Sequence, residues 1–433
     1  MKKKIILALA VVVILLGAGF AYAYFATDLF KTEKEMFFSY ISLDDSLKVF
    51  EDEKVTQYVE KQQNTAFTNK GEISLEMSGD ETLASDESIQ MLNNTNITFE
   101  GKTDTASKLA EQNITIDLGQ GFNIPFKFKC DGESIGIQTD FLDSKFVAVK
   151  NENLKALVEK FGIESDEIPD KIDFTQEQFT EEELKTLEDR YIAILNEKLT
   201  DELFSKQKVD KQTIITLNMS EAKFIEVSTK ILETLRNDEI ILNKVTTTIE
   251  DFQTQIDELL NDLKTIETSE TNRFEMKIYV ESRKVQKYEI AIIEDNETLA
   301  VVVIENLSNG INVKMYENTI LLAEMSIVKE NNENDVSYKM IMKINTETEG
   351  EVEFTFTAQY KNIAASDNVE EVVDAIVSIE NIDMNLNYKN LTTFAPDTQI
   401  EGLNENNTLF LNDATEEQLQ NLMINLYTNL GLI

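Results

Sequence analysis

The hydrophobic and polar residues of this chain follow different periods in successive segments. Residues 5–25 form an unbroken apolar run behind Lys2, Lys3 and Lys4. A helix rises about 1.5 Å per residue, so this run is long enough to cross a bilayer core of roughly 30 Å. We therefore predict a transmembrane anchor over residues 1–25. Residues 26–68, charged and without glycine or proline, predict a juxtamembrane helical stalk.

The period becomes two from Gly71 onward, which predicts strands with one buried and one solvated face, as in an antiparallel sheet. Glycines punctuate the runs as hairpin turns would. The alternating apolar positions of this first series include Ile73, Leu75, Met77, Ile97, Phe99, Ile114, Ile116, Leu118, Phe122, Ile124, Phe126, Phe128, Ile135, Ile137 and Phe146.

A helical block is predicted over residues 151–267. One helix begins after Thr180, in a capping-box pattern, and another begins after Ser220. A third carries a seam with heptad spacing. It packs across a sheet or, alternatively, joins two copies of the chain. The seam residues are Val245, Ile249, Phe252, Ile256, Leu259, Leu263 and Ile266.

A second series of alternating strands runs from Phe274 to Tyr388, with a strong turn signal at Asn309-Gly310, and a last helix covers residues 415–430. The predicted fold class is α+β. After the N-terminal transmembrane helix come two antiparallel sheet-plus-helix units, each with a curved sheet packed on helices, over residues 69–200 and 201–433.

Two interpretations of the N-terminus stay open. Ala21-Tyr22-Ala23 fits a signal peptidase site, which would release a soluble protein. However, the apolar run continues through Phe25 without a polar region before that site, which favours the retained anchor. The lysines then stay inside, so the rest of the chain lies outside the cell membrane.

The chain is strongly acidic, with 80 acidic and 40 basic residues among 433 and a net charge of −40. This charge disfavours nucleic acid as a partner and favours cations or basic partners, although solubility is the simpler explanation. There is no histidine, which removes the usual general base and most zinc sites. The one cysteine, Cys130, is expected to be a buried structural thiol.

No catalytic, cofactor-binding or metal-binding residues are predicted, and we expect a protein that is not an enzyme and has no cofactor. The oxygen-rich segment 331–335 lacks the bend glycine of a calcium loop, so a hairpin tip is the better interpretation. Glu181-Glu182-Glu183 and Glu370-Glu371 are expected to point to different sides of helices, which precludes a paired acid and base.

The opening segment, from Lys2 through Phe25-Ala-Thr-Asp-Leu-Phe-Lys31 to Met36-Phe37-Phe38-Ser39-Tyr40-Ile41, resembles an uncharacterised family of single-span extracytoplasmic envelope proteins from low-GC Gram-positive bacteria. The strand and helix order also resembles, at fold level, the curved sheets of bacterial lipoprotein carriers. The resemblance implies an envelope location and brings no assigned function.

Two functions are consistent with these features. The first is a non-enzymatic, membrane-anchored envelope protein whose sheet presents a groove for an apolar ligand, such as a lipid, or for another envelope component. The alternative is a cell-surface scaffold that docks a partner protein through its helices, including the heptad seam. The expected location is the cell membrane, single-pass, with the C-terminal domain extracytoplasmic.

Overall fold

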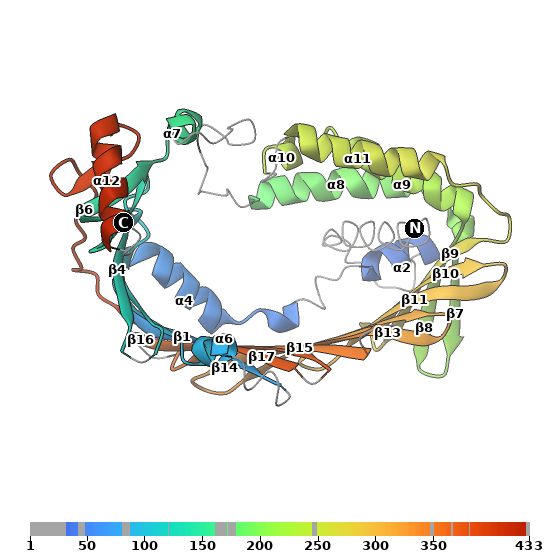
Figure 1. The fold of residues 1–433 in the computed structure, drawn as a ribbon. Coiled ribbons are helices and arrows are strands. Elements are labelled where there is room, and N and C mark those ends of the chain that lie inside the picture. Colours follow the sequence, from blue (N-terminus) through green and yellow to red (C-terminus); the bar gives the residue numbers. More distant parts are fainter. Residues whose placement is uncertain are drawn as a thin grey trace. The chain divides into compact units, whose positions relative to one another are not determined.

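The structure is a computed structural model that describes residues 32–41, 48–79, 87–119, 121–160, 171, 179–244, 249–346, 350–364, 367–380 and 382–429 (Figure 1). Its contacts divide the chain into two compact units, both discontinuous in sequence. Unit 1 comprises Met1–Phe50, Thr175–Val328 and Ile341–Thr348. Unit 2 comprises Glu51–Phe174, Lys329–Met340 and Glu349–Ile433.

Seven strands of unit 1 form a meander in which each strand pairs antiparallel with the next along the chain. The turn between the fourth and fifth uses Asp295 and Asn296, both with positive φ (51° and 67°), the geometry that tight hairpins prefer. The strands are β7 (Phe204–Val209), β8 (Gln212–Ser220), β9 (Arg273–Glu281), β10 (Lys284–Glu294), β11 (Glu297–Asn306), β12 (Gly310–Glu317) and β13 (Ile320–Asn331).

The helices of unit 1 begin at the predicted caps. The Thr180 side chain accepts from the backbone N–H of Glu183, and the Glu183 carboxylate accepts from that of Thr180, which confirms the capping box. Ser220 caps the following long helix, also as predicted. The helical elements are α2 (Glu33–Tyr40), η2 (Lys48–Phe50), α8 (Glu181–Lys198), η3 (Asp201–Leu203), α9 (Glu221–Leu235), α10 (Glu239–Leu242) and α11 (Ile249–Lys264).

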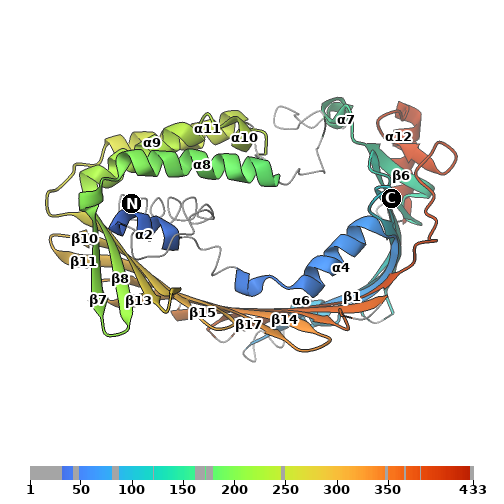
Figure 2. The same ribbon diagram turned by 180° about the vertical axis from the view of Figure 1, so that it is seen from behind.

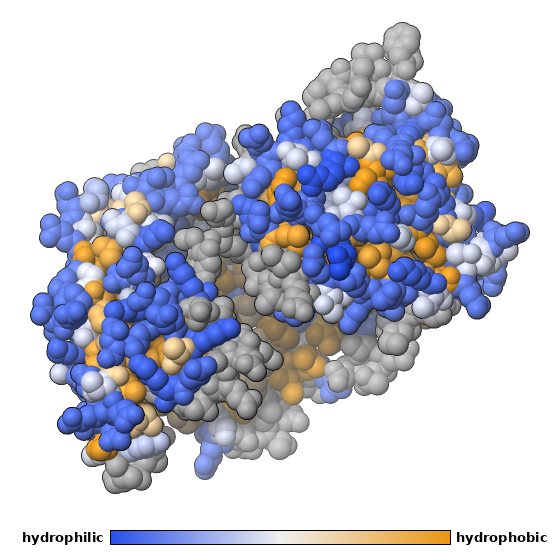
Figure 3. All heavy atoms as spheres, turned by 90° about the horizontal axis from the view of Figure 1, so that it is seen from above, coloured by the Kyte–Doolittle hydropathy of each residue, from blue (hydrophilic) through white to orange (hydrophobic). Residues whose placement is uncertain are grey.

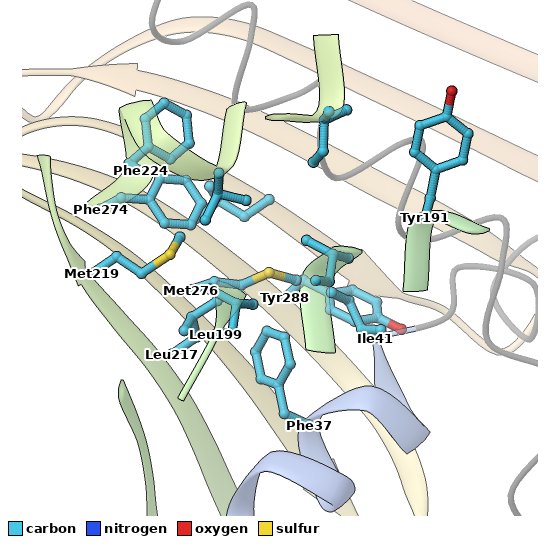
Figure 4. Packing of buried hydrophobic residues seen from close by; sticks show 14 of the residues in the cluster. Phe37, Ile41, Tyr191, Leu199, Leu217, Met219, Phe224, Phe274, Met276 and Tyr288 are labelled. Atoms are coloured by element: carbon cyan, nitrogen blue, oxygen red, sulfur yellow. The ribbon is translucent and has the colours of Figure 1, made fainter. Parts of the chain in front are cut away.

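One large hydrophobic core holds unit 1 together. Side chains from α2, α8, α9 and α11 meet the alternating residues of β7–β11. Phe37 of α2 is fully buried, and Phe224 of α9 stacks on Phe274 of β9 with ring centroids 4.9 Å apart (Figure 4). Seen from above, the outward surface of α8, α9 and α11 is mostly hydrophilic, with hydrophobic residues in small separate patches (Figure 3).

The heptad seam of α11 faces this core. Ile256 and Leu263 are buried, and Phe252, Leu259 and Ile266 pack against the same cluster. The helix lies along α9, so it covers a helix as well as the sheet beyond. The first two seam residues, 245 and 249, fall outside the side chains that the structure describes.

Unit 2 is built on a sheet in which strands far apart in sequence are neighbours. Strand β1 lies between β2 and β17, with Phe67 opposite Thr103 on one side and Phe394 on the other. The order of pairing is β15-β16-β17-β1-β2-β3-β4-β5-β6-β18, and β18 alone is parallel to its neighbour. The strands are β1 (Phe67–Ser78), β2 (Asn96–Asp104), β3 (Leu109–Asp117), β4 (Asn123–Cys130), β5 (Ser134–Thr139), β6 (Asp143–Lys150), β15 (Gly350–Lys361), β16 (Asn368–Ile379), β17 (Ile382–Phe394) and β18 (Thr408–Phe410).

One helix of unit 2, α4 (Glu53–Asn64), packs on the face of this sheet through Tyr58 and Val55 (Figures 1 and 2). The other helices are α6 (Glu87–Asn93), α7 (Leu154–Lys160) and α12 (Glu416–Asn429). The segment 331–335 forms the predicted hairpin tip before β14 (Val336–Thr346), where the Asn332 side chain accepts from the backbone N–H groups of Asn334 and Asp335.

The predicted fold class is wrong in its sheet arrangement. The strands do not form two separate sheets packed on helices, because the 18 strands found among the described residues belong to one mostly antiparallel sheet with few helices. Alternation shows which side chains share a face but not which distant strand is the neighbour. No transmembrane helix is found: the predicted anchor lies outside the described residues, and no described helix is both long and apolar enough to cross a membrane.

Candidate functional site

The sheet of unit 2 has one apolar and one polar face. Residues that pair directly across strands share a face, so the register assigns every side chain to one side. The apolar phase comprises Phe354, Phe356, Ala358 and Tyr360 on β15; Val369, Val373, Ala375 and Val377 on β16; Met384, Leu386, Tyr388 and Phe394 on β17; Phe67, Ile73, Leu75 and Met77 on β1; Ile97 and Phe99 on β2; and Ile114 and Ile116 on β3.

This apolar face is fully buried only at the end that α4 covers. Tyr58 of α4 is 4% exposed, with ring centroids 6.2 Å from Tyr360 and 5.9 Å from Phe394. Away from α4 the same face stays half-buried, and Leu386 is 40% exposed. Exposed apolar surface of this kind often marks a binding site.

A polar cluster interrupts the apolar face beside α4. Glu371 of β16 stands opposite Asn390 of β17, and Asn390 stands opposite Gly71 of β1. The Asn390 amide nitrogen donates to Glu371 Oε2 at 2.8 Å and to Thr392 Oγ1 at 3.1 Å. The hydroxyl of Tyr58 also donates to Thr392 Oγ1, at 3.1 Å. These residues tie the helix to the polar cluster.

Two glycines form the floor of this cluster. The Phe99 ring lies over Gly71 and stacks on Tyr388 from the other side, with centroids 5.9 Å apart and planes at 15°. A Cβ on Gly71 would come within 2.4 Å of the Phe99 ring. In the next row, the Gln112 amide lies over Gly101 in the same way. Absence of a side chain at these two positions is therefore required by these neighbouring side chains and by the backbone carbonyl oxygens of Lys389 and Glu111, which an added Cβ would also meet.

The cluster has more hydrogen-bond acceptors than donors. The Asn390 nitrogen must face the carboxylate of Glu371, because a carboxylate only accepts; the amide oxygen is then left buried without a partner. Gln112 donates to Asn69 at 2.9 Å, and its own oxygen is likewise unpartnered. An unsatisfied buried acceptor costs about 1–3 kcal/mol. The arrangement is suited to a ligand that brings donors.

The electrostatics of the cluster disfavour further negative charge. Burial raises the pKa of Tyr58 above its usual 10, and the charge of Glu371 raises it further. Burial, together with Glu371, likewise raises the pKa of Tyr388 to about 12. Both phenols therefore keep their protons to a higher pH than a free tyrosine does.

Sequence reasoning missed this cluster. Glu370 and Glu371 lie on strand β16, not on a helix, and they point to opposite faces of the sheet. One signal in the sequence could have revealed the site. Glu371 falls at an alternate position with the valines at 369, 373 and 377, so on a strand it would share their face. Cys130 lies at the end of β4 and is half-buried rather than buried. Glu183 caps α8.

The polar face of the same sheet carries a hollow of about 620 Å³ that is a weaker candidate. Its lysines are already paired with its glutamates: Lys70 with Glu100 at 3.6 Å, and Lys389 with Glu72 at 3.0 Å. Within the residues that the structure describes, no three Asp, Glu or Cys side chains gather to hold a metal ion.

Comparisons with known proteins add little to this geometry. No family model and no curated protein matches the chain. Among solved structures, the CymD monoaromatic hydrocarbon channel is 5% identical, with 81% of this chain and 93% of that chain covered and a TM-score of 0.19. A point mutant of transferrin-binding protein B from Haemophilus parasuis Hp5 is 7% identical, with 77% of each chain covered and a TM-score of 0.13. Pseudomonas aeruginosa OccK3 is 6% identical, with 79% of this chain and 99% of that chain covered and a TM-score of 0.14.

These values amount to a weak similarity to proteins built on a large curved antiparallel sheet. No family model supports the envelope family expected from the opening segment. TM-scores this low carry no argument about function.

Proposed function

We propose that unit 2 binds an amphiphilic molecule on its apolar face and acts without catalysis. The observation that carries this proposal is the change in burial along one face. Beneath α4 the side chains of the apolar face are buried, as at Val369 and Phe394, whereas farther along β17 they are exposed, as at Leu386. The polar cluster stands at the boundary between the two. An apolar surface with a few convergent polar groups is the usual form of a small-molecule site.

The alternative function, partner docking through the helices, receives less support. The seam of α11 would have to face outward, but Ile256 and Leu263 are buried in the unit 1 core. On described helices, three exposed apolar residues of α12 lie within about one turn of each other, Met423, Ile424 and Tyr427, and a patch of this size is ordinary for a surface helix.

Two leucines on β17 provide a matched pair for testing ligand binding. Leu386 lies on the apolar face and is 40% exposed, whereas Leu391 lies on the polar face and is 45% exposed. Native mass spectrometry of the purified full-length chain is expected to show a discrete amphiphile adduct. Leu386→Lys should remove the adduct and Leu391→Lys should retain it. Absence of any adduct from the unmodified chain, or equal adducts on both variants, would overturn the proposal.

The cellular location is proposed from the sequence alone. The three N-terminal lysines and the apolar run after them support a chain held at the cell membrane with its folded part outside. Protease added to intact protoplasts should then digest the folded part. Protection from the protease would overturn this orientation, and intact protein in the medium starting at Tyr24 would show cleavage after Ala23 instead.

A further inference from the structure

Glu371 has no counter-ion within its own face. It is the only acidic residue in the apolar phase of β15, β16, β17, β1, β2 and β3, and that phase contains no lysine or arginine. Among the described residues, the lysines of α4 have other partners. Lys61 pairs with Asp367 at 2.8 Å, and Lys54 donates to the carbonyl of Asn332. A carboxylate beside apolar surface is normally paired with a cation.

The second unsatisfied group lies beside this carboxylate. Asn390 is 6% exposed, and its amide oxygen has no donor while its nitrogen is held by Glu371 and Thr392. The site therefore lacks a cation for Glu371 and a donor for the amide oxygen of Asn390. A primary ammonium group supplies both at once.

We infer that the amphiphile bound by unit 2 carries a primary ammonium head group, which pairs with Glu371 and donates to the amide oxygen of Asn390. The inference rests on the proposed function and specifies its ligand class. The net charge of −40 also favours a cationic head group over an anionic one. The site favours an alkylammonium over an anionic lipid, because Glu371 would repel an anion.

The apolar tail has a path that leads away from the head group. From Asn390 to Met384 along β17 the strand runs for six residues, roughly 20 Å at about 3.3 Å per residue. A lipid tail spans about half of a bilayer core of roughly 30 Å. The half-buried Tyr388 and the exposed Leu386 lie along this stretch, with Ile73 and Leu75 of β1 paired opposite them.

Probes of equal chain length test the head group on the unmodified full-length chain. Dodecylammonium, dodecanoate and dodecyltrimethylammonium are titrated below the concentrations at which they form micelles, and binding is followed by native mass spectrometry. Dodecylammonium should bind at least about tenfold more tightly than dodecanoate, because of the charge. It should also bind more tightly than the trimethyl probe, which has the charge but no N–H donor. Equal affinity for all three would overturn the inference.

Adjacent carboxylates provide the matched variants. Glu371→Gln removes the charge on the apolar face, whereas Glu370→Gln removes one charge on the polar face and changes the net charge equally. The preference for dodecylammonium should be lost in the first variant and kept in the second. Circular dichroism checks that both fold; if Glu371→Gln does not, the three-probe comparison still decides.

The outcomes separate this inference from the proposed function. If all probes bind alike and Leu386→Lys abolishes their binding, the apolar face binds ligands and the ammonium inference is wrong. If no probe binds, both fail. If Glu370→Gln lowers the preference as much as Glu371→Gln, the effect is one of overall charge, and the assigned contact is wrong.

Discussion

Tyr58 should be the main anchor of α4 on the unit 2 sheet. It is 4% exposed, and its ring meets those of Tyr360 and Phe394. An isolated helix of 12 residues is marginal in water, so α4 depends on such packing for its order. Replacing Tyr58 by Ala removes the ring contacts and leaves a cavity.

The size of the effect follows from what each substitution removes. Tyr58→Ala deletes a buried aromatic ring, and such changes cost about 3–5 kcal/mol. Tyr58→Phe deletes only the hydroxyl. Thr392 then keeps its hydrogen bond from Asn390, and Gln62, half-buried, can turn to water. That loss should be about 0.5–1.5 kcal/mol.

Urea unfolding and hydrogen exchange over residues 53–64 measure these effects. Val59→Ala is the matched control. Val59 follows Tyr58 in the same helix and is 42% exposed, so its substitution should change the free energy of unfolding by no more than about 0.5 kcal/mol. Exchange in α4 should rise steeply for Tyr58→Ala alone. If Tyr58→Ala is no more harmful than Val59→Ala, the packing of α4 on this face is not what orders the helix.

Three further predictions concern the core, the glycine floor and the phenols. Phe252→Ser and Leu259→Ser, both half-buried against the unit 1 core, should each cost about 2–4 kcal/mol and lower the thermal unfolding midpoint; unchanged midpoints would mean that the seam faces outward. Gly71→Val should displace the Phe99 ring, cost about 1–3 kcal/mol and change the near-ultraviolet circular dichroism; an unchanged spectrum would contradict the proposed contact. The pKa of Tyr388, raised to about 12 from 10 in the unfolded chain, means that stability is fully present below pH 10 and is lost as pH rises toward 12. Urea midpoints across that range, with Tyr388→Phe as control, test the sign, and midpoints that stay constant or rise above pH 10 would refute it.

Local features of the fold were predictable because they depend on a few neighbouring residues. The caps at Thr180 and Ser220 and the hairpin tip at 331–335 are set by side chains that bond to nearby backbone, so their sequence signals are direct. Alternation identified most strands for the same reason.

The joining of the strands into one sheet was not predictable in this way. Strand β1 pairs with β17, more than 300 residues later, and no local pattern specifies that neighbour. Strand β16 was missed altogether, because Val372 and Ile376 place apolar residues on its second face and obscure the alternation. The pair of acids at 370 and 371 then resembled a helix surface.

The candidate site depends on that missed strand. Gly71 was interpreted as the start of a strand series, whereas it is a place where a neighbouring ring crosses the backbone. A glycine signal of this kind is ambiguous until the strands on both sides are known. The same holds for Asn390, whose partners come from β16 and β17 together.

A comparison within the molecule argues that the polar cluster of unit 2 serves more than folding. Unit 1 also buries an acid, Asp238, which is 2% exposed. That carboxylate caps α10, accepts from the hydroxyl of Tyr191 and pairs with Arg190, so its charge and its hydrogen bonds are satisfied. Glu371, in contrast, has no cationic partner on its face of the sheet. The amide oxygen of Asn390 beside it has no donor. Buried oxygens without a donor also occur in unit 1, at Asn306 and Asn312, so the carboxylate without a counter-ion is what distinguishes the polar cluster. Valine at both positions would match the surrounding strands at lower cost to folding, which supports the proposal that a cationic ligand completes the site.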